Sequence, residues 1–150
     1  MSSLIKKTYT FLTVVSPTTS LIEDQVFKIN SHFRIPSAIM HGGCSYDNGK
    51  PIFLEVAQKH VKVLLAISER YVLPSFHRFI RKIHKELGMN LQFAINEGHC
   101  PSKECSNAVF RKCCGGIPTI FKDHFNKRPI LIVSATIKND DTADLEHLFI

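Results

Sequence analysis

The stretch that decides the fold is VKVLLAISERYVLPSFHRFIRKIHKELGMNLQFAI, residues 61–95. Its first part, residues 61–67, is an aliphatic run typical of a buried β-strand. Its middle part carries apolar residues at helical spacing, namely Phe76, Phe79, Ile80, Ile83 and Leu87. Gly88 ends this predicted helix, and residues 91–95 form a second apolar run. A strand, a helix and a strand in succession predict two parallel strands of one sheet.

The same alternation continues on both sides of this stretch. Residues 11–15, 37–40 and 129–133 have the composition of further short strands. The strands of the sheet are therefore expected to end at Val15, Met40, Ile67, Ile95 and Val133. This pattern predicts an α/β layer fold with a mainly parallel sheet. Because the sequence shows no internal repeat and no linker, residues 1–150 are expected to form one domain.

Other helices are predicted from capping residues and apolar spacing. The helix after Pro17 is expected to be capped by Thr19 or Ser20 and to carry Glu23 and Asp24 in its first turn. The apolar side of this helix contains Leu21, Ile22, Val26, Ile29 and Phe33. Further helices are expected at residues 53–59, 117–125 and 142–149, with a turn at 49–51.

The composition is that of an ordinary globular protein. Hydrophobic residues make up 44% and charged residues 21% of the chain, which argues against wholesale disorder. No apolar run approaches the roughly 18 residues of a membrane span. No signal peptide is recognised, so a soluble protein without membrane contacts is expected. Five cysteines, an odd number, favour a reducing compartment, either the nucleus or the cytoplasm. The net charge of +6 favours polyanionic partners.

Polar residues follow three of the predicted strands. Ser16 and Pro17 end the first strand, Asn96-Glu97-Gly98-His99-Cys100 follows the strand at 91–95, and Ser134-Ala135-Thr136 follows the last one. Binding and catalytic groups of α/β folds lie at the carboxyl ends of parallel strands. The three segments are therefore candidates for one shared site.

Four segments, in this order, resemble motifs of the first motor domain of RecQ-type DNA helicases, members of helicase superfamily two. VVSPTTSLIEDQV (residues 14–26) resembles motif Ia. KVLLAISERYVLPSF (62–76) resembles the next nucleic-acid motif, with Ser68, Glu69 and Arg70 matching and the usual proline missing. FAINEGHC (93–100) resembles the Asp-Glu-Ala-His-Cys box, and ILIVSATI (130–137) resembles motif III. The resemblance extends over about residues 10–140 and implies a three-layer RecA-like fold.

This resemblance implies an ATP-dependent 3′–5′ DNA helicase motor that uses ATP and Mg²⁺. Glu97 matches the glutamate that positions the attacking water, and Asn96 stands where the family has an aspartate that holds Mg²⁺ through water. His99 and the segment Ser134, Ala135 and Thr136 match residues that couple the nucleotide to the nucleic acid. The residues implied to contact DNA, as a single strand or at a duplex junction, are Ser16, Thr18, Thr19, Ser20, Ser68 and Arg70.

The sequence also departs from the family. No G-x-x-x-x-G-K-[ST] phosphate-binding loop and no second motor domain occur in the 150 residues. Lys103 and Glu104 stand where an aromatic-rich loop of the family has Gln and Trp. We therefore expect a motor domain that is truncated before motif Ia and that neither hydrolyses ATP nor unwinds DNA alone. The alternative is a non-catalytic nucleic-acid-binding remnant or a partner-dependent interaction domain, because a missing strand would leave sheet edges for a protein partner to complete.

The cysteines suggest two other chemistries, and neither is favoured. His99, Cys100, Cys105, Cys113 and Cys114 lack the paired C-x2-C spacing of a structural zinc site. Cys100 beside His99 has no orienting third group that would make it a nucleophile.

Three further patterns have simple structural interpretations. Gly42-Gly43 and Gly115-Gly116 are interpreted as turns, because no Lys-Ser or Lys-Thr follows them. The hydroxyls of Thr18, Thr19 and Ser20 suit either helix capping or phosphate binding. A solvated helix face is favoured over a nucleic-acid patch for Arg78, Arg81, Lys82 and Lys85.

Overall fold

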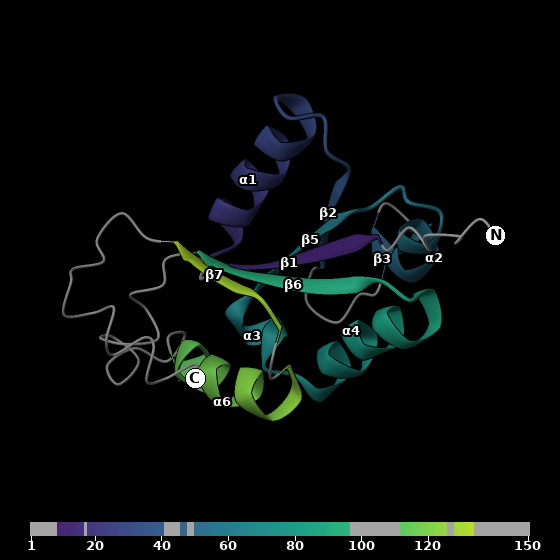
Figure 1. Ribbon diagram of the computed structural model, residues 1–150. Coiled ribbons are helices and arrows are strands. Elements are labelled where there is room, and N and C mark those ends of the chain that lie inside the picture. Colours follow the sequence, from purple (N-terminus) through teal and green to yellow (C-terminus); the bar gives the residue numbers. More distant parts are fainter. Residues whose placement is uncertain are drawn as a thin grey trace.

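A computed structural model of the chain describes residues 9–16, 18–40, 46–47, 50–96, 112–125 and 128–133 (Figure 1). The first elements are β1 (Thr10–Ser16), α1 (Thr19–Ser31), β2 (Ser37–Met40), β3 (Tyr46–Asp47), β4 (Lys50–Pro51) and α2 (Ile52–Ala57). They are followed by β5 (Val63–Ile67), α3 (Ser68–Tyr71), α4 (Pro74–Leu87), β6 (Asn90–Asn96), α6 (Lys112–His124) and β7 (Ile130–Val133). Strands and helices thus alternate along the chain, as the sequence predicts.

The centre of the fold is a five-stranded sheet in the order β2-β5-β1-β6-β7, in which all neighbouring strands are parallel. β1 lies in the middle, with Leu12 opposite Val63 of β5 and Val14 opposite Ala94 of β6. β7 lies at one end of the order and pairs with β6. The five strands are those predicted from the sequence. β1 and β6 each extend one residue beyond the prediction at both ends, whereas β5 begins two residues and β7 one residue later than predicted.

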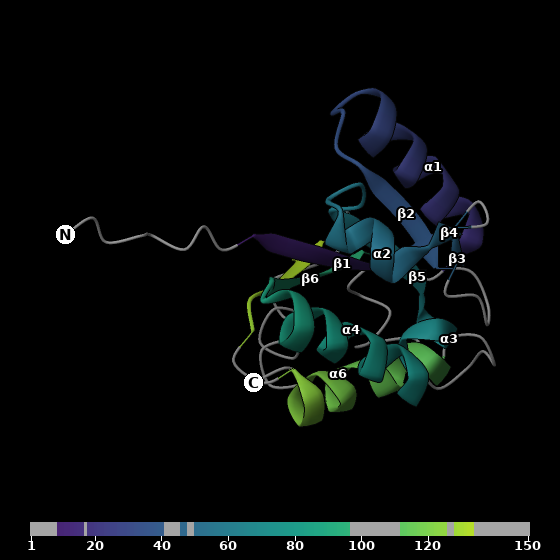
Figure 2. The same cartoon turned by 90° about the vertical axis from the view of Figure 1, so that its right-hand side faces the viewer.

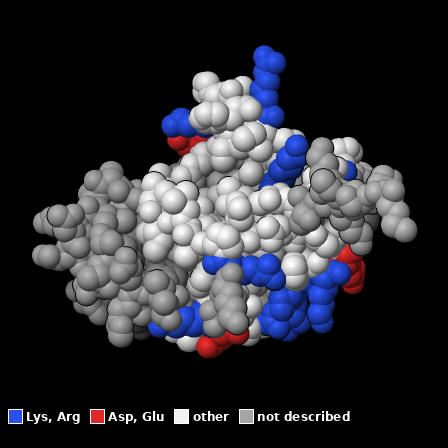
Figure 3. Space-filling model, in the orientation of Figure 1, with Lys and Arg blue, Asp and Glu red and all other residues white. Residues whose placement is uncertain are grey.

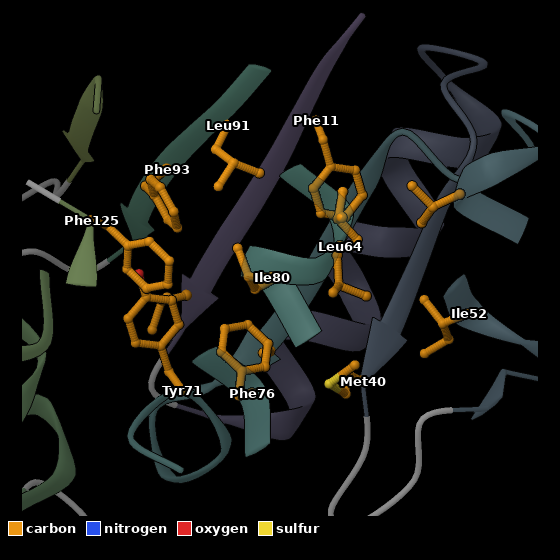
Figure 4. Close-up of a cluster of buried hydrophobic side chains, with 14 of the residues drawn as sticks. Phe11, Met40, Ile52, Leu64, Tyr71, Phe76, Ile80, Leu91, Phe93 and Phe125 are labelled. Atoms are coloured by element: carbon orange, nitrogen blue, oxygen red, sulfur yellow. The ribbon is translucent and has the colours of Figure 1, made fainter. Parts of the chain in front are cut away.

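Helices cover both faces of this sheet. α1 lies on one face, and α3, α4 and α6 lie on the other (Figures 1 and 2). Under α1 the buried cluster is small and consists of Ile22, Ile39, Val63 and Leu65. The cluster on the other face is larger and rich in aromatic rings, including Phe11, Tyr71, Phe76, Phe93 and Phe125 (Figure 4). The predicted three-layer α/β fold with a mainly parallel sheet is confirmed.

Helix α4 shows how the local sequence sets the limits of an element. Pro74 occupies its first turn, where the missing backbone N–H has no helical partner to lose. Gly88 ends the helix with a φ of 63°, a left-handed conformation that glycine adopts without strain. Phe76, Ile80 and Ile83 are fully buried against the sheet. The apolar stripe predicted for this helix is therefore confirmed.

Helix α1 differs from its prediction in three details. Its cap is Thr18, whose Oγ1 accepts a hydrogen bond from the Leu21 N–H at 3.4 Å. The first turn contains no acidic residue as a result, and Asp24 instead pairs with Lys28 at 2.7 Å. Because the helix ends at Ser31, Phe33 lies beyond it and is 70% exposed rather than part of its apolar side.

The short elements also differ from their predictions. Lys50 and Pro51 form β4, which pairs antiparallel with β3, although the sequence predicts a turn at 49–51. Helix α2 ends at Ala57, before the predicted residue 59, and Lys59 adopts a left-handed φ of 63° that no helix continues.

Helix α6 begins at Lys112, earlier than the predicted residue 117. It therefore includes Gly115 and Gly116, contrary to the predicted turn. A glycine inside a helix costs about 1 kcal/mol relative to alanine, and burial of Ile117, Phe121 and Phe125 offsets that cost.

The predicted helix at 142–149 lies outside the described residues. Within the described part, none of the helices combines the length and the apolar composition that crossing a bilayer requires.

Candidate functional site

The carboxyl ends of the parallel strands define one edge of the sheet. Since β1 lies between β5 and β6, Ser16 at the end of β1 stands next to Ile67 of β5. Asn96 ends the strand on the other side of β1, and Ser68 follows β5 directly. Residues from three of the segments that resemble helicase motifs thus converge at this edge.

A chain of hydrogen bonds connects β6, β1 and α1 at this edge. The Asn96 side-chain amide donates from Nδ2 to Ser16 Oγ at 3.5 Å, and Ser16 Oγ donates to Gln25 Oε1 at 2.9 Å. Ser16 is fully buried, so these bonds satisfy a hydroxyl that would otherwise lack a partner. With its nitrogen turned to Ser16, the Asn96 amide keeps its oxygen as the acceptor for a water or a ligand proton.

Ser68 and Arg70 lie in the short helix α3 rather than in an open loop. Both are buried, and Arg70 is 6% exposed. Its Nε has no hydrogen-bond partner among the described residues. A buried polar group without a partner costs about 1–3 kcal/mol. The Nε–H of Arg70 is therefore a buried donor that an acceptor oxygen could satisfy.

Tyr71 anchors α3 to the core and so fixes where Ser68 and Arg70 lie. Its ring lies 5.1 Å from that of Phe76 and meets the Phe93 ring edge-on at 6.5 Å (Figure 4). Burial raises the pKa of the Tyr71 hydroxyl well above its ordinary value of 10.0. The phenol stays neutral as a result, and α3 is held by apolar packing.

The amino-terminal turn of α1 presents hydroxyl groups near Ser16. Thr18 Oγ1 is engaged with the backbone as the helix cap, whereas the side chains of Thr19 and Ser20 are exposed. The amino end of a helix carries a partial positive charge and unpaired N–H groups that favour phosphate oxygens. Capping is therefore the role of Thr18, and Thr19 and Ser20 are the hydroxyls open to a ligand.

Several predicted site residues lie outside the described residues. They are Glu97, His99, Ser134, Ala135 and Thr136, together with Cys100 and Cys105. Cys113 and Cys114 belong to α6, and the structure describes only their backbone. In the part of the chain that the structure describes, no three His, Cys, Asp or Glu side chains are grouped as metal ligands.

Sequence reasoning missed Gln25, which links α1 to Ser16. The signal was present, because Gln25 interrupts the apolar side of α1 between Ile22 and Val26. A polar residue on the inward side of a helix needs a buried partner.

No family model matches the chain in a comparison with known protein families.

Proposed function

We propose that the chain is part of the first motor domain of a RecQ-like DNA helicase and that it binds single-stranded DNA at the carboxyl edge of its sheet. The observation that supports this most is the strand order, which brings Ser16, Ser68 and Asn96 together from segments that are far apart in sequence. These are the segments that resemble the family's nucleic-acid and nucleotide motifs.

The groups at this edge suit the phosphate backbone. Thr19 and Ser20 offer exposed hydroxyls at the positive end of α1, and Arg70 adds a positive charge in α3, which follows β5 at the same edge of the sheet. Contacts of this kind position a nucleic-acid strand without reading its bases. The expected binding is therefore weak, independent of base sequence and steeply reduced by salt.

ATP chemistry belongs to the proposal only through Glu97 and Asn96. In a complete motor, Glu97 would position the attacking water, and the Asn96 amide oxygen would accept a hydrogen bond from a water bound to Mg²⁺. Asparagine lacks the negative charge that an aspartate gives to a Mg²⁺ site, and the 150 residues contain no phosphate-binding lysine loop. We therefore expect the 150-residue chain neither to hydrolyse ATP nor to unwind DNA alone. DNA-stimulated ATP hydrolysis that Glu97→Gln abolishes would contradict this expectation.

A non-catalytic nucleic-acid-binding protein is the second candidate. The replacement of the family's aspartate by Asn96 favours it, because binding DNA through hydroxyls and backbone amides needs no metal ligand.

The decisive experiment measures binding of a fluorescent oligothymidine by anisotropy at low and at physiological salt. The double variant Thr19→Ala/Ser20→Ala removes two candidate contacts, each worth about 0.5–1.5 kcal/mol. Its affinity should fall by about tenfold or more. Thr10→Ala removes an exposed hydroxyl from the opposite, amino edge of β1 and is the matched control. Equal losses in both variants, or no binding by the parent chain at low salt, would overturn the proposal.

A further inference from the structure

A seam of histidines and arginines joins α4 to the end of α6. His77, Arg81 and His84 follow one another at helical spacing on α4, and they face His124 of α6 and Arg128 beyond it. Among the described residues, none of these five side chains pairs with a carboxylate. In Figure 3, Lys and Arg side chains gather over the lower part of the molecule, where Figure 1 shows α4 and α6. The polar contacts between α4 and the end of α6 are thus made by groups that are cationic or able to become so.

Two hydrogen bonds across the seam assign acceptor roles to histidine ring nitrogens. Arg81 Nη2 contacts His124 Nδ1, and Arg128 Nη2 lies 3.0 Å from His84 Nε2. A guanidinium can only donate, so both ring nitrogens must accept and carry no proton. His84 Nδ1 lies 2.8 Å from the Met89 carbonyl oxygen and must donate to it. In this arrangement His84 accepts at Nε2 and donates at Nδ1, and His124 accepts at Nδ1.

His77 adds a third imidazole at the same place. It is 4% exposed, donates from Nε2 to the Tyr71 carbonyl at 2.7 Å, and lies 4.8 Å from His124 between ring centroids. Burial lowers the pKa of His77, and the neighbouring His124 and Arg81 lower that pKa further, against the opposing effect of its hydrogen bond to Tyr71. The surroundings of His77 therefore disfavour the protonated form of its imidazole.

The other charged groups of the packed helices do not balance these cations. α4 exposes Arg78, Lys82, Lys85 and Glu86, and α6 exposes Lys122 and Asp123. α3 adds Glu69, which is half-buried, and Arg70, which is buried. Of these groups, the positive ones outnumber the negative ones on α4 and equal them on α6 and α3, so protons added to the seam, which already holds Arg81 and Arg128, meet a net positive field.

We propose that this seam is a pH-sensitive latch that holds α6 against α4 only while His77, His84 and His124 are neutral. A protonated imidazole has no lone pair to accept the Arg81 or Arg128 hydrogen bond, and it places two like charges in contact. Histidine is the side chain that ordinarily gains charge between pH 8 and pH 5. Acidification therefore breaks both hydrogen bonds and adds repulsion at the same interface.

Release of α6 has a defined structural consequence. α6 covers the core with Ile117 and Phe121, and Phe125 directly follows the helix, with its ring 4.7 Å from that of Phe93. An open latch exposes these apolar groups, whereas α1 on the opposite face keeps its own contacts.

Native-state hydrogen exchange of α6 amides, corrected for intrinsic rates, measures the latch directly. Each histidine that must be neutral for docking raises the opening constant by up to tenfold per pH unit below about pH 6.5. Between about pH 7.5 and pH 5.5 the wild-type opening constant should rise about a hundredfold or more.

The test variant is His84→Gln/His124→Asn, which keeps an acceptor for each arginine but cannot be protonated. Its opening constant should rise by no more than about tenfold over the same range, since only His77 remains. His32→Asn, at the exposed position directly after α1, is the matched control and should behave as wild type. A pH-independent wild type, or a double variant with the full rise, would overturn the proposal.

A measurement on the wild-type protein covers the case in which the double variant does not fold. Nitrogen-15 spectra of the imidazoles at neutral pH should show His84 with its proton on Nδ1 and His124 with its proton on Nε2. The opposite tautomer at His84 would leave the Arg128 bond without an acceptor and would contradict the latch.

Discussion

The two faces of the sheet are built very differently. The face under α3, α4 and α6 buries a continuous aromatic and aliphatic cluster, whereas the face under α1 buries four residues. The side chains of β7, which alternate between the two faces, show the same difference. Ile130 and Ile132 pack on the larger cluster, whereas Leu131 and Val133 on the other face are 61% and 48% exposed. The face that α4 and α6 cover therefore buries most of the apolar side chains. The face under α1, called the thin face below, buries few, and α1 positions polar groups at the carboxyl edge of the sheet.

The largest expected effect comes from emptying each face in turn. Phe93 is 2% exposed and lies between the rings of Phe121 and Phe125. Phe93→Ala should cost about 3–5 kcal/mol of unfolding free energy. Ile22→Ala on the α1 face should cost less, about 2 kcal/mol, because the smaller cluster leaves fewer contacts to lose. Chemical denaturation measures both, and a larger loss for Ile22→Ala would reverse the ranking of the faces.

The next effect is the acid sensitivity of the larger face. Since the pKa of His77 is lowered in the folded protein, the unfolded chain binds more protons below about pH 6.5. The stability contribution is therefore present above that pH and is lost as the pH falls. Between about pH 7.5 and pH 5.5 the wild type should lose more unfolding free energy than His77→Gln, which keeps a donor for the Tyr71 carbonyl. Equal acid losses in denaturation experiments would contradict this assignment.

Much of the fold follows from short-range patterns. The five strands were predictable because an aliphatic run bounded by Gly, Pro or Ser has few alternatives in a buried sheet. The predicted ends also placed Ser16 and Asn96 at one edge, because parallel strands share a carboxyl end. What failed were the choices between near-equal local options, such as Thr18 rather than Thr19 as a cap. Helix α6 runs through Gly115 and Gly116 because tertiary burial outweighs helix propensity.

The details of the site depended on contacts between distant residues. Whether Arg70 is exposed is decided by helices that pack around α3, not by its neighbours in sequence. The seam pairs, Arg81 with His124 and His84 with Arg128, join residues that are 43 and 44 positions apart. No periodicity reveals such pairs. The four basic residues predicted to be solvated, Arg78, Arg81, Lys82 and Lys85, are exposed as expected, but the contact of Arg81 with His124 of α6 could not be predicted.

Arg70 offers a smaller effect that separates structure from function. Because its buried Nε lacks a hydrogen-bond partner among the described residues, Arg70→Met removes a cost while retaining most of the side-chain volume. The unfolding free energy should rise by about 1 kcal/mol, and binding of oligothymidine should weaken. Lys85→Ala removes an exposed charge from α4, remote from that edge, and serves as the control for net charge. A destabilised Arg70→Met variant with unchanged DNA binding would show that the guanidinium serves packing.

The smallest effect on stability, yet a clear one on solution behaviour, is expected at the end of the thin face. Leu131 projects from β7 on the same side of the sheet as α1, but its side chain remains 61% exposed. The strand Ile130–Val133 carries no charged residue that would discourage pairing with another chain. Leu131→Lys should change the unfolding free energy by less than about 0.5 kcal/mol, since little burial is lost. The same variant should reduce self-association in sedimentation experiments, because a lysine disfavours strand addition and apolar contact at once. Leu54→Lys is the matched control, since Leu54 is 51% exposed on α2 and belongs to no strand. If both lysine variants reduce self-association equally, added net charge is the cause, and the exposed face of β7 has no special role.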